Sequence, residues 1–120
     1  MHSVVFFRTA AGHEPAREFI QAPEKEDRQV IGFDLRTVQD GFPIGMPVCR
    51  PLRSGLFEVR STLPSRREAR LLFFVDGTLV MVVHGLIKKT EKTPPKDLEL
   101  ARARKAEFEA NKKKATPQKP

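Results

Sequence analysis

Two apolar runs joined by an Asp-Gly dipeptide constrain the fold more than any other feature of this sequence. Residues 69–85 read ARLLFFVDGTLVMVVHG. The β-branched and aromatic residues favour strands, and the dipeptide at 76–77 favours a two-residue type I′ turn. We therefore expect an antiparallel hairpin in which Arg70 lies opposite Val83. Alternation along that ideal register places His84 on the face opposite to Arg70.

The remaining sequence predicts further elements on both sides of this hairpin. In order, the expected elements are a strand at 3–8, a helix at 15–21, a helix from Pro23 to Gly41, a strand at 55–61, the hairpin, and a helix at 94–114. Three prolines and a glycine in residues 42–51 predict a loop there. This order, β-α-α-β-β-β-α, is typical of an α+β fold with a small twisted antiparallel sheet and helices packed on one face.

The length of 120 residues fits one domain, which we place at residues 1–111, followed by a basic flexible tail at 112–120.

No apolar run exceeds five residues and no signal-peptide pattern is present, so the sequence predicts a cytoplasmic protein without a membrane contact. Cys49 is the only cysteine, which fits a reducing compartment. Its position between two prolines does not favour a nucleophile.

The charge of the chain is unevenly distributed. Residues 1–43 hold five Lys/Arg and seven Asp/Glu, whereas residues 44–120 hold seventeen and eight. A one-sided basic surface is typical of a protein that binds a polyanion, although solvated lysines give the same composition. The three scattered histidines and Cys49 have no metal-ligand spacing, so we expect no metal or other cofactor.

Three motifs occur in order along the second half of the chain. They are GLFEVR at 55–60, ARLLFFVDG at 69–77 and HGLIKKTEKTP at 84–94. This series resembles the RelE/HigB superfamily of toxins from type II toxin–antitoxin modules, in particular its phage-derived HigB-like branch. The resemblance implies a RelE-like fold, cleavage of messenger RNA on the ribosome, and neutralisation by a partner antitoxin, which we expect to be a helix-turn-helix protein.

Two other functions remain open at this point. A sister branch that resembles ParE inhibits DNA gyrase without enzymatic activity on the same fold, and fold alone does not decide function. The third alternative is a basic nucleic-acid-binding phage protein that has no catalytic activity.

The chemistry implied by the resemblance is attack of the RNA 2′-hydroxyl on the adjacent phosphate. Cations aimed at the resulting phosphorane would lower the barrier by roughly 3 kcal/mol per well-placed donor. The resemblance assigns Arg70 to the scissile phosphate, with Arg60 and Lys89 as further cations. Glu58 is either a base or a carboxylate that orients these arginines, and His84 is a weaker candidate base.

Other basic residues near these motifs are expected to bind RNA phosphates. They are Arg53, Lys88, Lys92 and Lys96. The chain contains no tyrosine and no histidine after His84, so the general base is not identified by the sequence.

Overall fold

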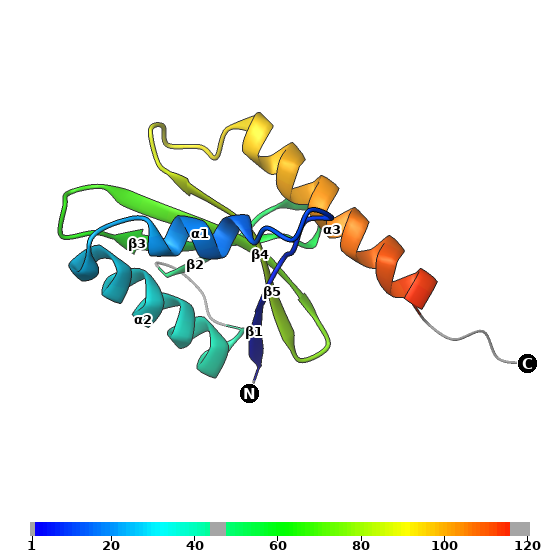
Figure 1. Cartoon of the computed structure of the whole chain (residues 1–120). Helices are drawn as coiled ribbons and strands as arrows, with labels where there is room; N and C mark the ends of the chain where they lie inside the picture. Colours follow the sequence, from blue (N-terminus) through cyan, green and yellow to red (C-terminus); the bar gives the residue numbers. More distant parts are fainter. Residues whose placement is uncertain (1, 44–47, 116–120) are drawn as a thin grey trace, which may run out of the picture.

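The structure, a computed structural model, describes residues 2–43 and 48–115. It contains a five-stranded sheet in the order β1-β5-β4-β3-β2, with helices on both faces (Figure 1). The elements are β1 (Ser3–Phe6), α1 (Pro15–Gln21), α2 (Lys25–Gly41), β2 (Cys49–Pro51), a short 3-10 helix (Arg53–Gly55), β3 (Phe57–Thr62), β4 (Glu68–Asp76), β5 (Leu79–Ile87) and α3 (Pro95–Ala115).

The α+β class and the order of the expected elements are confirmed, but two features of the sheet differ from the expectation. β1 pairs in parallel with β5, so the sheet is mixed rather than antiparallel. A short strand, β2, pairs antiparallel with β3 inside the region expected to be a loop. Pro51 is tolerated there because β2 is an edge strand, which needs ladder hydrogen bonds on one side only.

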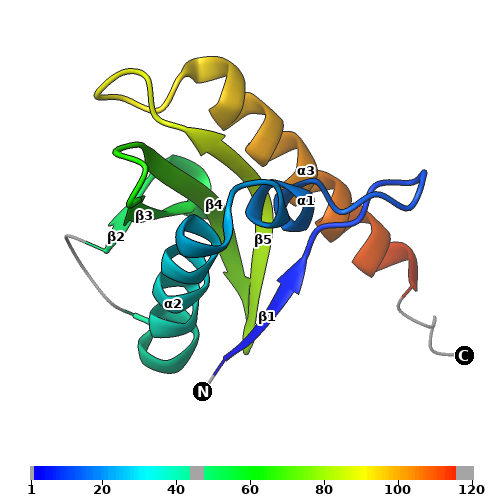
Figure 2. The same cartoon turned by 60° about the vertical axis from the view of Figure 1, so that its left-hand side comes forward.

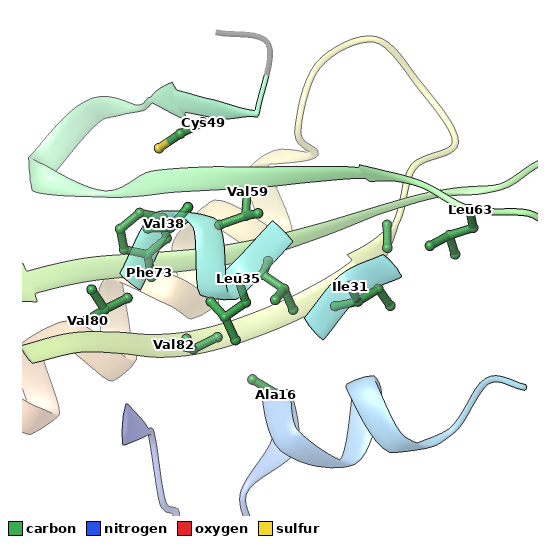
Figure 3. Close-up of a cluster of buried hydrophobic side chains, with 12 residues drawn as sticks. Ala16, Ile31, Leu35, Val38, Cys49, Val59, Leu63, Phe73, Val80 and Val82 are labelled. Atoms are coloured by element: carbon green, nitrogen blue, oxygen red, sulfur yellow. The ribbon is translucent and has the colours of Figure 1, made fainter. Parts of the chain in front are cut away.

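One face of the sheet packs against α1 and α2. Ala16, Ile31, Leu35 and Val38 contact apolar residues of β3, β4 and β5 in this core, including Phe73 (Figure 3). Within α2, Ile31, Leu35 and Val38 recur at helical spacing and form one buried stripe.

The opposite face of the sheet packs against α3, which corrects the expectation that all helices lie on one face (Figure 2). The helix has few apolar residues, and Ala101 and Phe108 are the ones that join this second core. Two cations complete the contact, because the Arg104 guanidinium lies 5.7 Å from the Phe7 ring centre and Lys105 Nζ lies 5.8 Å from that of Phe74. Long basic side chains can cover apolar surface in this way, so α3 packs on the sheet although it contributes few apolar residues.

The hairpin is present, but its register differs from the ideal one. The turn is Gly77-Thr78, because Asp76 pairs with Leu79. The turn therefore lies one residue further along the chain than expected. This change alone leaves each side chain on its predicted face of the sheet. A bulge in β5 then inserts one extra residue, so that Leu72 pairs with His84.

The bulge corrects the predicted position of His84. One inserted residue moves every later side chain to the other face of the sheet. Arg70 pairs with Leu86 instead of Val83, and His84 reaches the same face as Arg70. That face is the one covered by α3.

At its C-terminal end, α3 continues to Ala115, beyond the expected start of the tail at residue 112; residues 116–120 lie outside the described part of the chain. Lys112 Nζ lies 2.7 Å from the Asp76 carboxylate, which connects this end of α3 to the hairpin turn. In the described ranges, no helix has the length and apolar character needed to cross a bilayer.

Candidate functional site

A groove rich in cations lies where three segments of the chain meet. The segments are the β2–β3 hairpin, the loop at residues 88–94 and the first turns of α3. The groove has a volume of about 550 Å³. Its lining residues are Arg50, Pro51, Leu52, Arg53, Lys92, Thr93, Leu98 and Arg102. Four of these eight residues are cationic and none carries a carboxylate or an imidazole; we call this site the basic groove.

Local backbone geometry places Arg53 at the tip of the β2–β3 hairpin. Ser54 and Gly55 both have positive φ values, 63° and 74°, which turn the chain sharply. The Leu52 N–H donates a hydrogen bond of 2.7 Å to the Leu56 carbonyl and closes the turn. Arg50 lies just before this turn, opposite Glu58 in the β2–β3 ladder.

The cations of the basic groove are not neutralised by any carboxylate in the described part of the chain. Among the described residues, Arg50, Arg53, Lys92 and Arg102 form no ion pair. Four unpaired cations on one concave surface create a positive potential that attracts an anionic ligand. Arginine in particular presents a planar fork that matches phosphate oxygens.

A buried ionic cluster lies beside Thr93 of the groove, on the face of the sheet that α3 covers. Arg70 is 1% exposed and Glu58 is fully buried, with 3.6 Å between Arg70 Nη1 and Glu58 Oε2. Arg70 Nε also donates to Glu68 Oε2 at 3.2 Å. Arg60 Nε lies 3.3 Å from Glu58 Oε1, although neither atom forms an aligned hydrogen bond among the described residues. The cluster thus joins three of the predicted site residues.

Arg70 is shielded from solvent by the loop at residues 88–94, the yellow loop before α3 in Figure 1. Arg70 Nη2 donates to the Glu91 carbonyl at 3.2 Å, and Nη1 donates to Thr93 Oγ1 at 3.4 Å. The Thr93 hydroxyl in turn donates to Glu58 Oε2. In this conformation the guanidinium of Arg70 is committed to partners inside the protein.

His84 belongs to a separate cluster between β5 and α3. Its Nε2 lies 2.7 Å from Asp97 Oδ1, and its Nδ1 lies 3.5 Å from Arg104 Nη1. Arg104 Nη1 also donates to the Val83 carbonyl at 2.8 Å. Both ring nitrogens of His84 therefore have neighbours, and the cluster fastens α3 to β5.

The other predicted site residues lie at different places. Arg53 and Lys92 line the basic groove. Lys88 Nζ lies near carboxylates of Glu68 and Glu91, at 3.7 Å and 3.6 Å. Lys89 and Lys96 are exposed and do not line the basic groove.

Sequence reasoning missed two of the four cations of the basic groove. Arg50 lies in β2, a strand hidden in a proline-rich segment. Arg102 follows Leu98 by one helical turn, and residues four apart share a face of a helix. That spacing, next to the lysine-rich segment, is the signal from which Arg102 could have been found.

The structure supplies neither a reactive thiol nor a cluster of metal ligands in its described ranges. Burial, followed by the nearby Glu58 carboxylate, raises the pKa of the Cys49 thiol to about 11, so it stays protonated at neutral pH. No group of three His, Cys, Asp or Glu side chains in residues 2–43 and 48–115 is arranged so that it could hold a metal ion.

Comparison with known proteins identifies the family of this chain. No curated protein matches the chain. The family described as phage-derived protein Gp49-like (DUF891) matches residues 18–106, which include β3, β4, β5, the loop after β5 and the start of α3. The match thus includes every residue that lines the basic groove. The chain belongs to this Gp49-like family of phage-derived proteins, a family of RelE/HigB-type toxins.

Proposed function

We propose that this protein is the toxin of a toxin–antitoxin pair and cleaves messenger RNA on the ribosome. The observation that carries the proposal is the basic groove, in which four cations lack any ion pair among the described residues. RNA is the polyanion that a RelE/HigB-type toxin would meet in the cytoplasm, where we place the protein. Its family implies a partner antitoxin, which we expect to be a helix-turn-helix protein.

In the proposed reaction, the 2′-oxygen of a ribose forms a bond to the adjacent phosphorus and the bond to the 5′-oxygen breaks. The 2′-hydroxyl loses a proton, and the leaving oxygen gains one. The intermediate phosphorane carries more negative charge than the substrate. Guanidinium groups of Arg50, Arg53 and Arg102 would stabilise it, each by roughly 3 kcal/mol if placed within hydrogen-bond distance.

The buried cluster has a different part in this proposal. Arg60 keeps 19% of its side chain exposed, whereas Arg70 keeps 1%. Arg60 is therefore the arginine of the cluster that can reach a phosphate without rearrangement. Glu58 and Arg70 are buried and would stabilise the site without contacting RNA. Lys88, Lys89 and Lys96 are proposed as contacts to more distant phosphates, which supply affinity rather than sequence choice.

The composition of the basic groove supports dependence on the ribosome. None of its lining residues carries an imidazole or a carboxylate, the side chains that most often act as general bases. His84 lies between Asp97 and Arg104 instead of in the groove. The proton acceptor for the 2′-hydroxyl must then come from outside the groove, and a ribosome that distorts the message could also align the attack.

The proposal is tested by incubating the purified chain with a messenger RNA, alone and bound to ribosomes. We expect cleavage only with ribosomes. Arg102→Ala should lower the cleavage rate by about 100-fold, the cost of one lost oxyanion donor. Arg36→Ala is the matched control, because Arg36 is an exposed arginine of α2 and its ion pair with Asp40 lies at the surface.

Each other outcome changes the proposal in a defined way. Cleavage of free RNA would refute ribosome dependence. Intact RNA in both reactions, together with loss of DNA supercoiling by gyrase, would replace the endonuclease with a ParE-like inhibitor. Intact RNA with unaffected gyrase and RNA binding that depends on Arg102 would leave a non-catalytic nucleic-acid-binding protein.

A further inference from the structure

Thr93 is the residue at which the basic groove meets the buried cluster. Thr93 lines the groove, yet the residue is only 9% exposed. Its hydroxyl donates to the buried Glu58 carboxylate and accepts from Arg70 at 3.4 Å. Among the described residues, no other residue lining the groove bonds to Glu58 or Arg70 through its side chain.

The neighbouring residues show what this contact fixes. Lys92 precedes Thr93 and also lines the groove. The Lys92 carbonyl accepts a hydrogen bond of 2.7 Å from the Thr90 hydroxyl, so the backbone of this part of the loop is braced internally. The Glu91 carbonyl, on the other side of Lys92, is held by Arg70. The backbone of Lys92 is thus fixed on both sides by the same buried pair, Glu58 and Arg70.

We propose that Thr93 is a positioning residue that latches the loop at residues 88–94 to buried Glu58 and thereby holds Lys92 in the basic groove. On an unlatched loop, the Lys92 side chain would sample many positions. It would then lose conformational freedom when it binds RNA, which weakens the contact. The inference rests on the proposed function only in taking RNA as the ligand of the groove. It does not require cleavage.

The test uses Thr93→Val, which keeps the shape of the side chain and removes the hydroxyl. Binding of the folded variant to a single-stranded RNA oligonucleotide is measured over a range of salt concentrations. Each phosphate contact contributes about 0.7 to the slope of log affinity against log salt. We expect the slope of Thr93→Val to be shallower by about 0.7, as for Lys92→Ala. The double variant should show no further loss, because both changes remove the same contact.

Two further variants separate positioning from general stability. Thr93→Ser retains the hydroxyl and should restore the wild-type slope. Ser61→Ala is the matched control, because the Ser61 hydroxyl also donates to a carboxylate, that of Asp34 at 2.7 Å, from a buried position on the same strand as Glu58. It removes an equivalent hydrogen bond away from the loop and should leave the slope unchanged. If Thr93→Val does not fold, Thr93→Ala, which leaves room for water at Glu58, serves in its place.

A second measurement does not involve RNA. Amide hydrogen exchange of the loop should accelerate in Thr93→Val and remain as in wild type in Ser61→Ala. Unchanged loop exchange would overturn the latch. Faster exchange with an unchanged salt slope would overturn the positioning role while the proposed function stands. Wild-type protein that does not bind the oligonucleotide would overturn the role of Thr93 in RNA binding, whereas the proposed function is tested separately by the cleavage assay with ribosomes.

Discussion

Arg70 Nη1 lies 3.6 Å from Glu58 Oε2, and the side chains of both residues are almost completely removed from solvent. The pair is supported by Glu68, by Thr93 and by the Glu91 carbonyl. Burying two charges is unfavourable unless their remaining hydrogen-bonding groups are satisfied, and the neighbours largely meet this requirement. The pair connects the centre of the sheet to the loop that borders the basic groove.

Removing one partner of this pair should destabilise the protein strongly. Arg70→Met would leave the Glu58 carboxylate buried with only one arginine, Arg60, whose Nε forms no aligned hydrogen bond to it among the described residues; losing one partner of a buried pair costs about 3–5 kcal/mol. Urea denaturation measures the free energy of unfolding of each variant. The double variant Arg70→Met with Glu58→Leu should recover a large part of the loss, because no uncompensated carboxylate remains at position 58. A loss below 1 kcal/mol for Arg70→Met would contradict the buried pair.

A methyl group at Gly85 should also destabilise the fold. A Cβ atom at this position would overlap the Phe19 ring of α1. Overpacking of this kind typically costs about 1–3 kcal/mol. We expect Gly85→Ala to lower the free energy of unfolding by that amount, measured by urea denaturation. Gly32→Ala is the control: this exposed position in α2 has no atom within 4 Å of the added Cβ, and alanine should stabilise the helix by about 0.5–1 kcal/mol.

The thiol of Cys49 should be unreactive in the folded protein. Its pKa is raised from the ordinary value of 9.0 to about 11, chiefly by burial. A thiol reagent at pH 8 should therefore label the protein only after unfolding. Because the folded state holds this proton more tightly, stability is unaffected below pH 9.0 and falls as the pH rises towards about 11. Cys49→Ala should lack this part of the pH dependence, and rapid labelling of native protein would contradict the burial.

Asp27 should contribute to acid sensitivity. The Ser65 hydroxyl donates to its carboxylate at 2.7 Å, and this bond, aided by the Ser65 N–H and by Arg67, lowers the pKa of Asp27 below its ordinary value of 3.8. A lowered folded pKa gives stability that is present above pH 3.8 and lost as the pH falls further. Asp27→Asn should lower the free energy of unfolding at neutral pH. In acid, where wild-type Asp27 becomes protonated, the two free energies of unfolding should lie closer together. An equal difference at both pH values would argue against this role.

Much of the local structure followed from the sequence because its causes are local. The α1 helix occupies the predicted residues, 15–21, since Pro15 suits the first turn of a helix. The stripe of Ile31, Leu35 and Val38 on α2 and the apolar runs of β4 and β5 were likewise readable from their spacing. The motifs after residue 55 also indicated the toxin family that the match at residues 18–106 establishes.

The tertiary structure alone decided which residues form the site. One inserted residue in β5 reversed the face of His84, and alternation in the sequence carries no mark of such a bulge. Arg70 is buried because Glu58 and Thr93, which are 35 residues apart, meet around it. Arg50 and Arg102 share a groove only because an unexpected edge strand lies beside α3. Spacing along the chain determines helices and strands, whereas burial and convergence of charge depend on contacts between distant segments.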